Sequence, residues 1–151
     1  MNDTSIDRSA LDALLGFRLR RVNLALARKF ALATGDHGLR GGEFTSLAII
    51  ACNPGMSQNG ICRATGLDKS AAVAVIDDLL QRGWIARERC GEDRRRYQLT
   101  ITQAGKQALD DLVARTGDIE APILDALSTP ERAMLFALLD KLVDRVLDTD
   151  T

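Results

Sequence analysis

At 151 residues the chain has the length of a single domain with a sizeable core. Its composition, 46% hydrophobic and 27% charged, is typical of a globular protein, and no apolar run of about 18 residues indicates a transmembrane helix. The net charge of −1 is unevenly distributed: residues 102–151 carry ten acidic and five basic side chains, whereas residues 57–101 carry six acidic and eight basic ones. Such local clustering of arginine is typical of a protein with a polyanionic partner.

Two features predict a cytoplasmic protein. The N-terminus, MNDTSIDRSALDALLG, has acidic residues where a secretion signal has positive charge. The three cysteines are odd in number and irregularly spaced, which argues against a disulfide framework. Cys52 and Cys62 are expected to be buried thiols, whereas Cys90 is either an incidental exposed cysteine or a redox-active one.

The N-terminal segment 5–33 is predicted to be a helix with two apolar stripes. One stripe contains Leu11, Leu15, Val22 and Leu26, and the other contains Leu14, Phe17 and Leu24. Both must be buried, so we expect one to pack on the same domain and the other on a second subunit. A glycine-rich connection, 33–42, then leads to a short helix over 43–52.

Two helices joined by a tight turn follow. Ser57 is predicted to cap a helix that runs through Thr65 and ends at Gly66, and Asp68 to cap a longer helix over 69–82. This pattern predicts a helix-turn-helix whose second helix can enter a DNA groove. An ordinary pair of antiparallel helices is the alternative.

A β-hairpin is predicted directly after these helices, with strands over 84–89 and 97–101. The strands flank a Gly-Glu-Asp-Arg-Arg-Arg tip (91–96), so the whole region predicts a winged helix. An arginine-tipped wing can reach into the minor groove, whose negative potential attracts guanidinium groups; a solvated charged loop is the alternative.

Two long helices complete the chain. Thr102 is predicted to cap the first, which runs towards Leu127, and Ser128 to begin the second, which runs to about Leu147. The last helix has an apolar stripe of Leu135, Leu138, Leu142 and Val146. A monomer of this size could hardly cover so much apolar helix, which again indicates a dimer.

The order of these motifs resembles the MarR family of bacterial transcriptional regulators. The resemblance rests on the segments NPGMS, GLDKS, LxxRGWI, GEDRRR and LTIT, and on Asp93-Arg94-Arg95 followed by Leu99, Thr100-Ile101-Thr102 and Gly105. It implies one domain, 1–151, that is mainly α-helical with a small β-hairpin wing. The implied order is two helices, a short strand, two helices, two strands and two helices.

The resemblance also implies an architecture and a function. Segments 5–33 and 102–147 would form a dimer base, and 43–101 would form the winged helix-turn-helix DNA-binding lobe. The protein would be a homodimeric repressor, neither an enzyme nor a cofactor protein, that binds an inverted repeat in double-stranded DNA. A small aromatic acid would modulate its DNA affinity from a cleft between the base and the lobe.

The expected site residues are the following. DNA contacts are expected from Ser57, Gln58, Asp68, Lys69, Ser70, Ala71, Val73, Ala74, Arg94, Arg95 and Arg96. By resemblance, Arg95 enters the minor groove, Asp93 orders the wing tip, and Arg94 and Arg96 contact phosphates. The candidates for the effector pocket are Arg18, Arg21, His37 and Phe44, with solvated or acid-paired side chains as the alternative interpretation.

The recognition helix departs from the family pattern. Ala71, Val73 and Ala74 stand where relatives usually carry hydrogen-bonding or basic side chains, and Asp78 stands where a basic residue is common. Methyl contacts and groove shape are therefore expected to carry more of the specificity. The departure also leaves a second hypothesis open, a winged-helix dimer that associates with proteins and binds an operator weakly or not at all. An enzyme or a metal protein is least favoured, because His37 is the only histidine and no catalytic or ligand set is evident.

Overall fold

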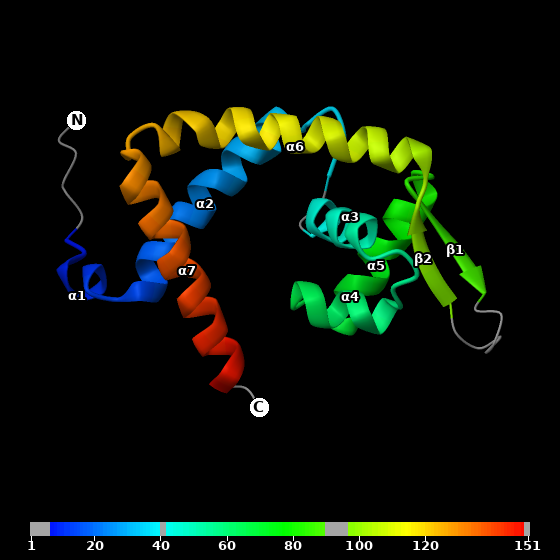
Figure 1. Cartoon of the computed structure of the whole chain (residues 1–151), viewed down its shortest axis with the longest axis horizontal. Coiled ribbons are helices and arrows are strands. Elements are labelled where there is room, and N and C mark those ends of the chain that lie inside the picture. Colours follow the sequence, from blue (N-terminus) through cyan, green and yellow to red (C-terminus); the bar gives the residue numbers. More distant parts are fainter. Residues whose placement is uncertain (1–6, 40–41, 90–96, 150–151) are drawn as a thin grey trace. The chain divides into compact units, whose positions relative to one another are not determined.

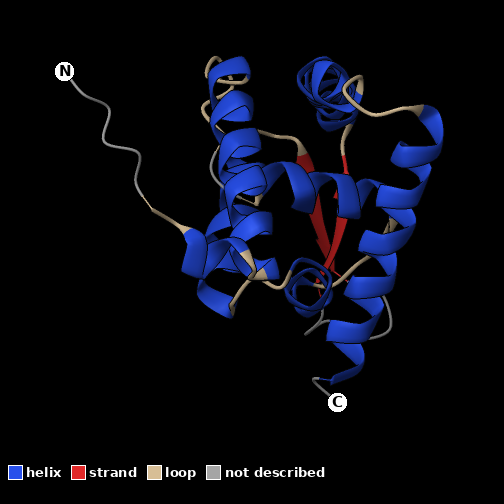
Figure 2. Cartoon of the chain, turned by 90° about the vertical axis from the view of Figure 1, so that its left-hand side faces the viewer, coloured by secondary structure: helices blue, strands red, loops and turns tan. Residues whose placement is uncertain are grey.

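The computed structural model of the chain describes residues 7–39, 42–89 and 97–149. In chain order its elements (Figure 1) are α1 (Ser9–Asp12), α2 (Leu15–Ala33), α3 (Glu43–Cys52), α4 (Gln58–Thr65), α5 (Lys69–Gln81), β1 (Ile85–Arg89), β2 (Tyr97–Ile101), α6 (Gln103–Leu124) and α7 (Thr129–Thr149). The described part is thus mainly helical with one two-stranded hairpin (Figure 2), which confirms the predicted fold class. None of its helices is both long and apolar enough to cross a bilayer.

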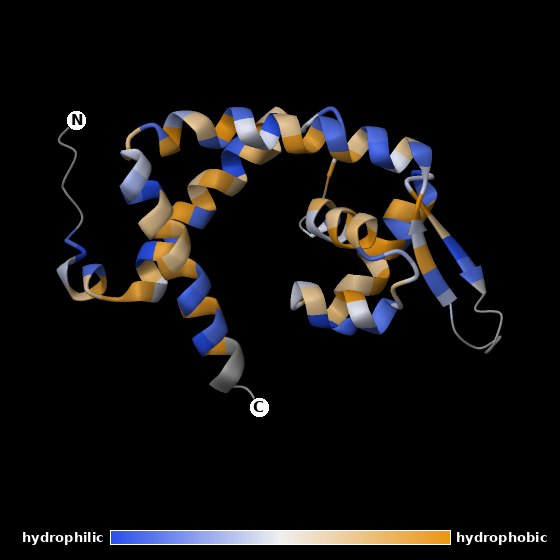
Figure 3. Cartoon of the chain, viewed as in Figure 1, coloured by the Kyte–Doolittle hydropathy of each residue, from blue (hydrophilic) through white to orange (hydrophobic). Residues whose placement is uncertain are grey.

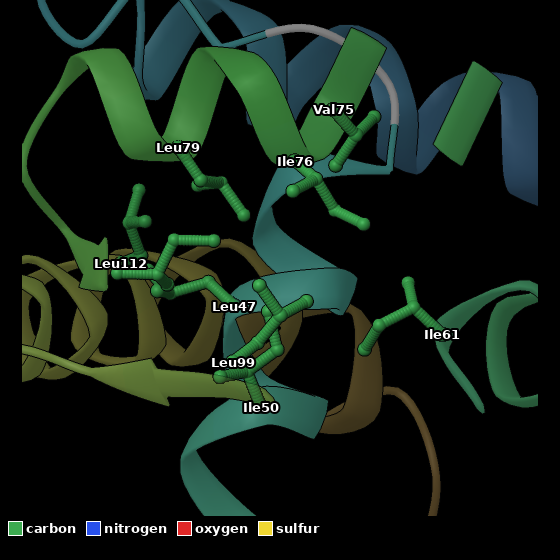
Figure 4. Close-up of a cluster of buried hydrophobic side chains, with 9 residues drawn as sticks. Leu47, Ile50, Ile61, Val75, Ile76, Leu79, Leu99 and Leu112 are labelled. Atoms are coloured by element: carbon green, nitrogen blue, oxygen red, sulfur yellow. The ribbon is translucent and has the colours of Figure 1, made fainter. Parts of the chain in front are cut away.

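The chain forms two compact units whose boundary falls within α6, after Thr116. The first unit is built around one hydrophobic core to which α3, α4, α5, both strands and α6 contribute (Figure 4). Its members are Leu47, Ile50, Ile61, Val75, Ile76, Leu79, Ile85, Leu99 and Leu112. The helix-turn-helix and the two strands therefore share a core, which joins the recognition helix and the strands in one compact unit.

The N-terminal helix is shorter than predicted. Leu14 has an extended backbone (φ −89°, ψ 123°) and separates the single turn of α1 from α2. The side chain of Arg18 donates to the carbonyl oxygen of Asp12 at 2.6 Å, a bond that an uninterrupted helix would give to a backbone N–H. The second residue of α2 is Gly16, and glycine has a low helix propensity. The prediction of a single helix over segment 5–33 is therefore wrong, because the continuous helix begins only at Leu15.

The predicted short third strand is a single bridge between Met56 and Leu99. Leu99 donates to the carbonyl oxygen of Met56 at 2.9 Å, and Gly55 donates back to that of Leu99 at 3.0 Å. A Cβ at Gly60 would lie 2.8 Å from Cγ of Met56. A larger residue at position 60 would therefore force the Met56 side chain to shift.

The start of α6 is fixed to the start of the hairpin. Thr102 donates its backbone N–H to the carbonyl oxygen of Trp84 at 2.9 Å and its hydroxyl to that of Gly83 at 2.6 Å. The hydroxyl also lies 3.1 Å from the Trp84 oxygen and accepts from the N–H of Gly105 at 3.0 Å. A Cβ at Gly105 would clash with the same Trp84 oxygen. Because Gly105 has no Cβ, the first turn of α6 can pack closely against the backbone of Trp84, just before β1.

The remaining boundaries agree with the sequence to within a few residues. Helix α6 ends at Leu124, and α7 begins after Ser128, whose N–H and hydroxyl both donate to the Glu131 carboxylate, at 2.8 and 2.6 Å.

The prediction for Cys52 is wrong, because this residue is exposed at the end of α3, and Cys62 is only half-buried.

Candidate nucleic-acid interface

The turn between α4 and α5 is formed by local hydrogen bonds that the sequence predicts. Gly66 adopts the left-handed conformation (φ 71°) that ends α4. One carboxylate oxygen of Asp68 accepts from the N–H of Ala71 at 2.8 Å and from the hydroxyl of Ser70 at 3.0 Å. These bonds, the one from Ala71 first, lower the pKa of the Asp68 carboxyl below its ordinary value. Asp68 is thus an ionised N-cap at the start of the recognition helix.

Helix α5 has one buried and one exposed stripe. Ala72, Val75, Ile76 and Leu79 face the core. The exposed side contains Lys69, Ser70, Val73, Ala74, Asp77 and Gln81, and Ala71 lies at its edge. Val73 is 40% exposed although it is apolar. The predicted base-facing residues of α5 thus lie on the solvent side, where a DNA groove can reach them.

A pocket of about 560 Å³ lies between the start of α4 and the hairpin. Its lining residues are Ser57, Gln58, Asn59, Arg63, Arg87, Tyr97 and Leu99. The guanidinium of Arg87 stacks on the Tyr97 ring, 5.4 Å from its centroid. Ser57 caps α4 by accepting from the N–H of Gly60 at 3.2 Å. The structure therefore brings Ser57 and Gln58 together with two arginines that the sequence analysis did not assign to the site.

These additional residues come from three separate elements. Arg63 lies on α4, Arg87 on β1 and Tyr97 on β2, in an antiparallel register that pairs Arg87 with Leu99. The strand face is buried at Leu99 and exposed at Tyr97, so it changes from core to pocket towards the wing. The sequence signal that could have indicated this is an arginine at position 87, on the same strand face as the buried Ile85.

The wing tip lies outside the described residues. The predictions for Asp93, Arg94, Arg95, Arg96 and Cys90 all fall there and stay predictions. The described strands end at Arg89 and resume at Tyr97, and these two residues pair with each other.

Arg82 connects the end of the recognition helix to the segment that follows α2. Its guanidinium donates to the carbonyl oxygens of His37 and Gly38, at 2.6 and 3.0 Å, and lies 5.1 Å from the centre of the Trp84 ring. It also lies 3.6 Å from the carboxylate of Glu43, which is completely buried. The position of α5 is therefore set by contacts with the connection that leads from the N-terminal helix.

A second cluster joins this connection to α6. Arg115 forms a two-pronged ion pair with Asp36, both N–O distances being 3.0 Å, and donates to the carbonyl oxygen of Ala33 at 2.7 Å and to Asp111 at 2.8 Å. Asp111 also contacts Nε2 of His37 at 2.8 Å. The bond to His37, followed by the charge of Arg115, lowers the pKa of the Asp111 carboxyl. Segment 33–38 is thus held from both sides, by α5 through Arg82 and by α6 through Arg115.

The four effector-pocket candidates lie in two places. Arg18 and Arg21 are on the first turns of α2, where both contact Asp12. His37 lies in the connection after α2, in contact with Asp111 and Trp84. Phe44, on α3, packs on Phe30 with 5.5 Å between ring centroids. No two of these four residues are in a recorded contact within the described part of the chain. That part also contains no group of three or more acidic, histidine or cysteine side chains that could hold a metal ion.

Known proteins place this lobe in a family. The sequence profile of the MarR family matches residues 37–96. A protein of Thauera aromatica named for transcriptional regulation of the hcr operon is 38% identical over 129 residues, 85% of this chain and 78% of that protein. The chain belongs to the MarR family. It is a transcriptional regulator of the winged-helix type, and its relatives are regulators, not enzymes.

Two solved structures show the same fold with their partners identified. The transcriptional repressor CouR, bound to a 23-mer DNA duplex, has a TM-score of 0.78 and 27% identity over 93% of this chain and 99% of its own. Bordetella bronchiseptica BpsR, whose DNA binding is regulated by 6-hydroxynicotinic acid, has a TM-score of 0.79 and 25% identity over 89% of this chain and 96% of its own. The MarR fold thus supports both DNA binding and small-molecule regulation in similar proteins.

Proposed function

We propose that the chain is a homodimeric repressor that binds an inverted repeat in double-stranded DNA and releases it when a small molecule binds. The observation that carries this proposal is the exposed stripe of α5 in a capped helix-turn-helix, followed by a hairpin whose tip contains three consecutive arginines. A recognition helix and a cationic wing on one core are the parts needed to contact a major and a minor groove together.

The dimer would be built from segments 5–33 and 102–147. Hydrophobic residues occur along both α2 and α7 (Figure 3). Large apolar side chains of these helices are exposed, among them Leu15, Val22, Leu138, Val143 and Val146. So much exposed apolar surface supports burial against a second copy of the chain. Light scattering at micromolar concentration should give twice the chain mass of 16.4 kDa, and a monomer would contradict the proposed architecture.

The DNA contacts are proposed to divide into two roles. Arg95 would enter the minor groove and Arg94 and Arg96 would contact phosphates, whereas Lys69 and Ser70 would meet the major groove at the start of α5. Removing a phosphate contact should weaken binding to all sequences alike and lower the salt slope by roughly one unit. Removing Arg95 should weaken binding by about 1–3 kcal/mol and relax the preference for A·T pairs at the flanks.

The test of these roles is a salt titration of DNA binding by the wild type, Arg94→Ala, Arg95→Ala and Lys69→Ala. Each variant is measured on an operator duplex and on a scrambled duplex of the same composition. A larger loss of specificity for Arg95→Ala supports groove insertion. Equal, sequence-independent losses for Arg94→Ala and Arg95→Ala would reduce the triple arginine to a phosphate clamp. If no variant changes DNA binding, the three arginines form a solvated loop and do not contact DNA.

The effector is proposed to be a small aromatic acid whose candidate contacts are Arg18, Arg21, His37 and Phe44; because these residues are not brought together, His37 is the contact for which the structure offers an argument. The support is the regulation of BpsR by 6-hydroxynicotinic acid and the position of His37 in the connection that holds α5. A carboxylate that displaced Asp111 from His37 would disturb the cluster that joins this connection to α6. Thermal-shift screening of aromatic acids should find a ligand that raises the melting temperature and weakens DNA binding. A ligand that stabilises the protein and never changes its DNA affinity would contradict the sensor model.

A second function is favoured by one observation only. The exposed apolar surface of Val73 and Ala74 on α5 would also suit a protein partner. Absence of sequence preference in the DNA titrations, with an intact dimer, would favour this alternative.

A further inference from the structure

The middle of the exposed stripe on α5 offers only methyl groups to a partner. Val73 and Ala74 are both exposed, one helical turn after Ser70 and one before Asp77. Positions i, i+3, i+4 and i+7 share one face of a helix, so these four side chains form a continuous surface. At its centre there is neither a donor nor an acceptor for a base edge.

The hydroxyl of Ser70 cannot supply the missing donor. It already donates to the Asp68 carboxylate at 3.0 Å, and Asp68 in turn caps the helix through Ala71. Donating to a base would break this local bond, whereas the lone pairs of the hydroxyl stay available as acceptors. Lys69, beside the cap, is the cation that remains in the first turn of α5.

Asp77 gives the far end of the stripe an acceptor and a negative charge. No salt bridge recorded among the described residues involves it, and its side chain is exposed. A carboxylate is repelled by phosphates, by the N7 and O6 acceptors of guanine and by O4 of thymine, but it accepts from the amino groups of cytosine and adenine. Among pyrimidines Asp77 therefore favours cytosine, while the methyl groups in the middle of the stripe complement the C5 position of a pyrimidine that carries a methyl.

We propose that α5 reads the C5-methyl group of pyrimidines in the major groove. Thymine carries this methyl in unmodified DNA, and 5-methylcytosine carries the same group at the same ring position. Val73 and Ala74 would contact the methyl, as apolar side chains do with thymine. In 5-methylcytosine the neighbouring amino group can also donate to Asp77, whereas thymine presents a carbonyl oxygen there. The proposal rests on the proposed function, since it requires α5 to enter the major groove.

The expected effect is modest for each contact and measurable for a dimer. Burial of one methyl group changes affinity roughly fourfold. Two equivalent half-sites would change it about fifteenfold if the two contacts are independent.

The experiment begins with the purified full-length protein and a library of random-sequence duplexes. The most enriched duplex is synthesised again with thymine replaced by uracil, one symmetric pair of positions at a time, which removes only the methyl. At the sensitive positions the T·A pair is then replaced by C·G and by 5-methylcytosine·G. We expect uracil to lower the affinity at one or more pairs of positions. At those positions, duplexes with 5-methylcytosine should bind at least fourfold more tightly than duplexes with cytosine for each methyl contact.

Variants identify the side chains that contact the methyl. Val73→Thr keeps the shape of the side chain and replaces one methyl with a hydroxyl, so the ratio of thymine to uracil affinity should fall towards one. Ala74→Ser should act in the same direction. Ala64→Ser, on an exposed position of α4, makes the same chemical change outside the stripe and should keep the wild-type ratio.

The outcomes separate this inference from the proposed function. If an enriched duplex binds equally well with thymine and with uracil at every position, methyl recognition is refuted while DNA recognition stands. If uracil weakens binding but 5-methylcytosine and cytosine are equivalent, the extension to 5-methylcytosine is refuted. If the library yields no enriched duplex, both the proposed function and this inference fail.

Discussion

The contact between α6 and the wing predicts opposite effects for the same substitution at two glycines of one helix. At Gly105 a new Cβ would clash with the carbonyl oxygen of Trp84 and lie 2.9 Å from Cγ1 of Ile101. A backbone oxygen cannot rotate away, so α6 must shift and strain the two bonds that Thr102 donates, from its N–H to Trp84 and from its hydroxyl to Gly83. At Gly117, also within α6, a Cβ would meet nothing within 4 Å.

The magnitudes follow from this geometry. Alanine is favoured over glycine in a helix by about 1 kcal/mol, so Gly117→Ala should stabilise the protein by roughly that amount. At Gly105 the same gain is outweighed by overpacking of about 1–3 kcal/mol and by about 1 kcal/mol for each weakened hydrogen bond. Gly105→Ala should therefore lower the free energy of unfolding by roughly 1–4 kcal/mol.

Urea unfolding at matched protein concentration measures both variants, with concentration held equal because a dimer unfolds at a concentration-dependent midpoint. The reasoning would be refuted if Gly105→Ala were as stable as Gly117→Ala.

Three further predictions concern the polar clusters and the apolar faces. Arg82→Met removes the guanidinium beside the buried Glu43 and should lower the free energy of unfolding by up to about 3 kcal/mol, and a second change, Glu43→Gln, should restore part of it in urea unfolding. The folded-state pKa of Asp111 is lowered, so the carboxylate stabilises the fold fully above its ordinary pKa of 3.8 and loses this effect as the pH falls through the folded-state value. The stability difference between the wild type and Asp111→Asn should therefore vanish in acid. A difference that persists there would contradict the ion-pair assignment. Leu138→Glu places a charge on the exposed apolar face of α7 and should give a chain-mass monomer in light scattering, whereas an unchanged dimer would exclude this face from the interface.

Local chemistry explains what was predictable in the lobe. A capping side chain and a left-handed glycine act within four residues, so Ser57, Gly66 and Asp68 define the helix-turn-helix from sequence alone. Strict alternation in Tyr97–Ile101 similarly predicts the second strand. The register of the two strands and the side of α5 that faces solvent come from the structure.

Tertiary contacts explain what was not predictable. The break at Leu14 depends on a side-chain bond from Arg18 to a backbone carbonyl, and the need for a glycine at position 60 depends on where Met56 packs. No local pattern distinguishes such residues from ordinary surface or helix positions. The same holds for Arg82, whose partners lie more than forty residues away in the chain.

The candidate site shows the same division. The residues of the recognition helix were predicted because their order along the chain resembles that of the MarR family. Arg63, Arg87 and Tyr97 were missed as site residues because three elements must fold before their side chains line one pocket. Exposure of Cys52 was missed for a related reason, since a small residue on a short helix does not reveal which side the neighbouring elements cover.

The most direct test of the account is the affinity of the purified protein for an inverted repeat taken from the DNA upstream of its own coding sequence. Binding is measured against a scrambled duplex of the same length and composition, at one near-physiological salt concentration. A sequence-specific regulator of this fold should prefer the inverted repeat by about a thousandfold or more, with one dimer per duplex. Equal affinity for the two duplexes would contradict sequence-specific recognition by this winged helix.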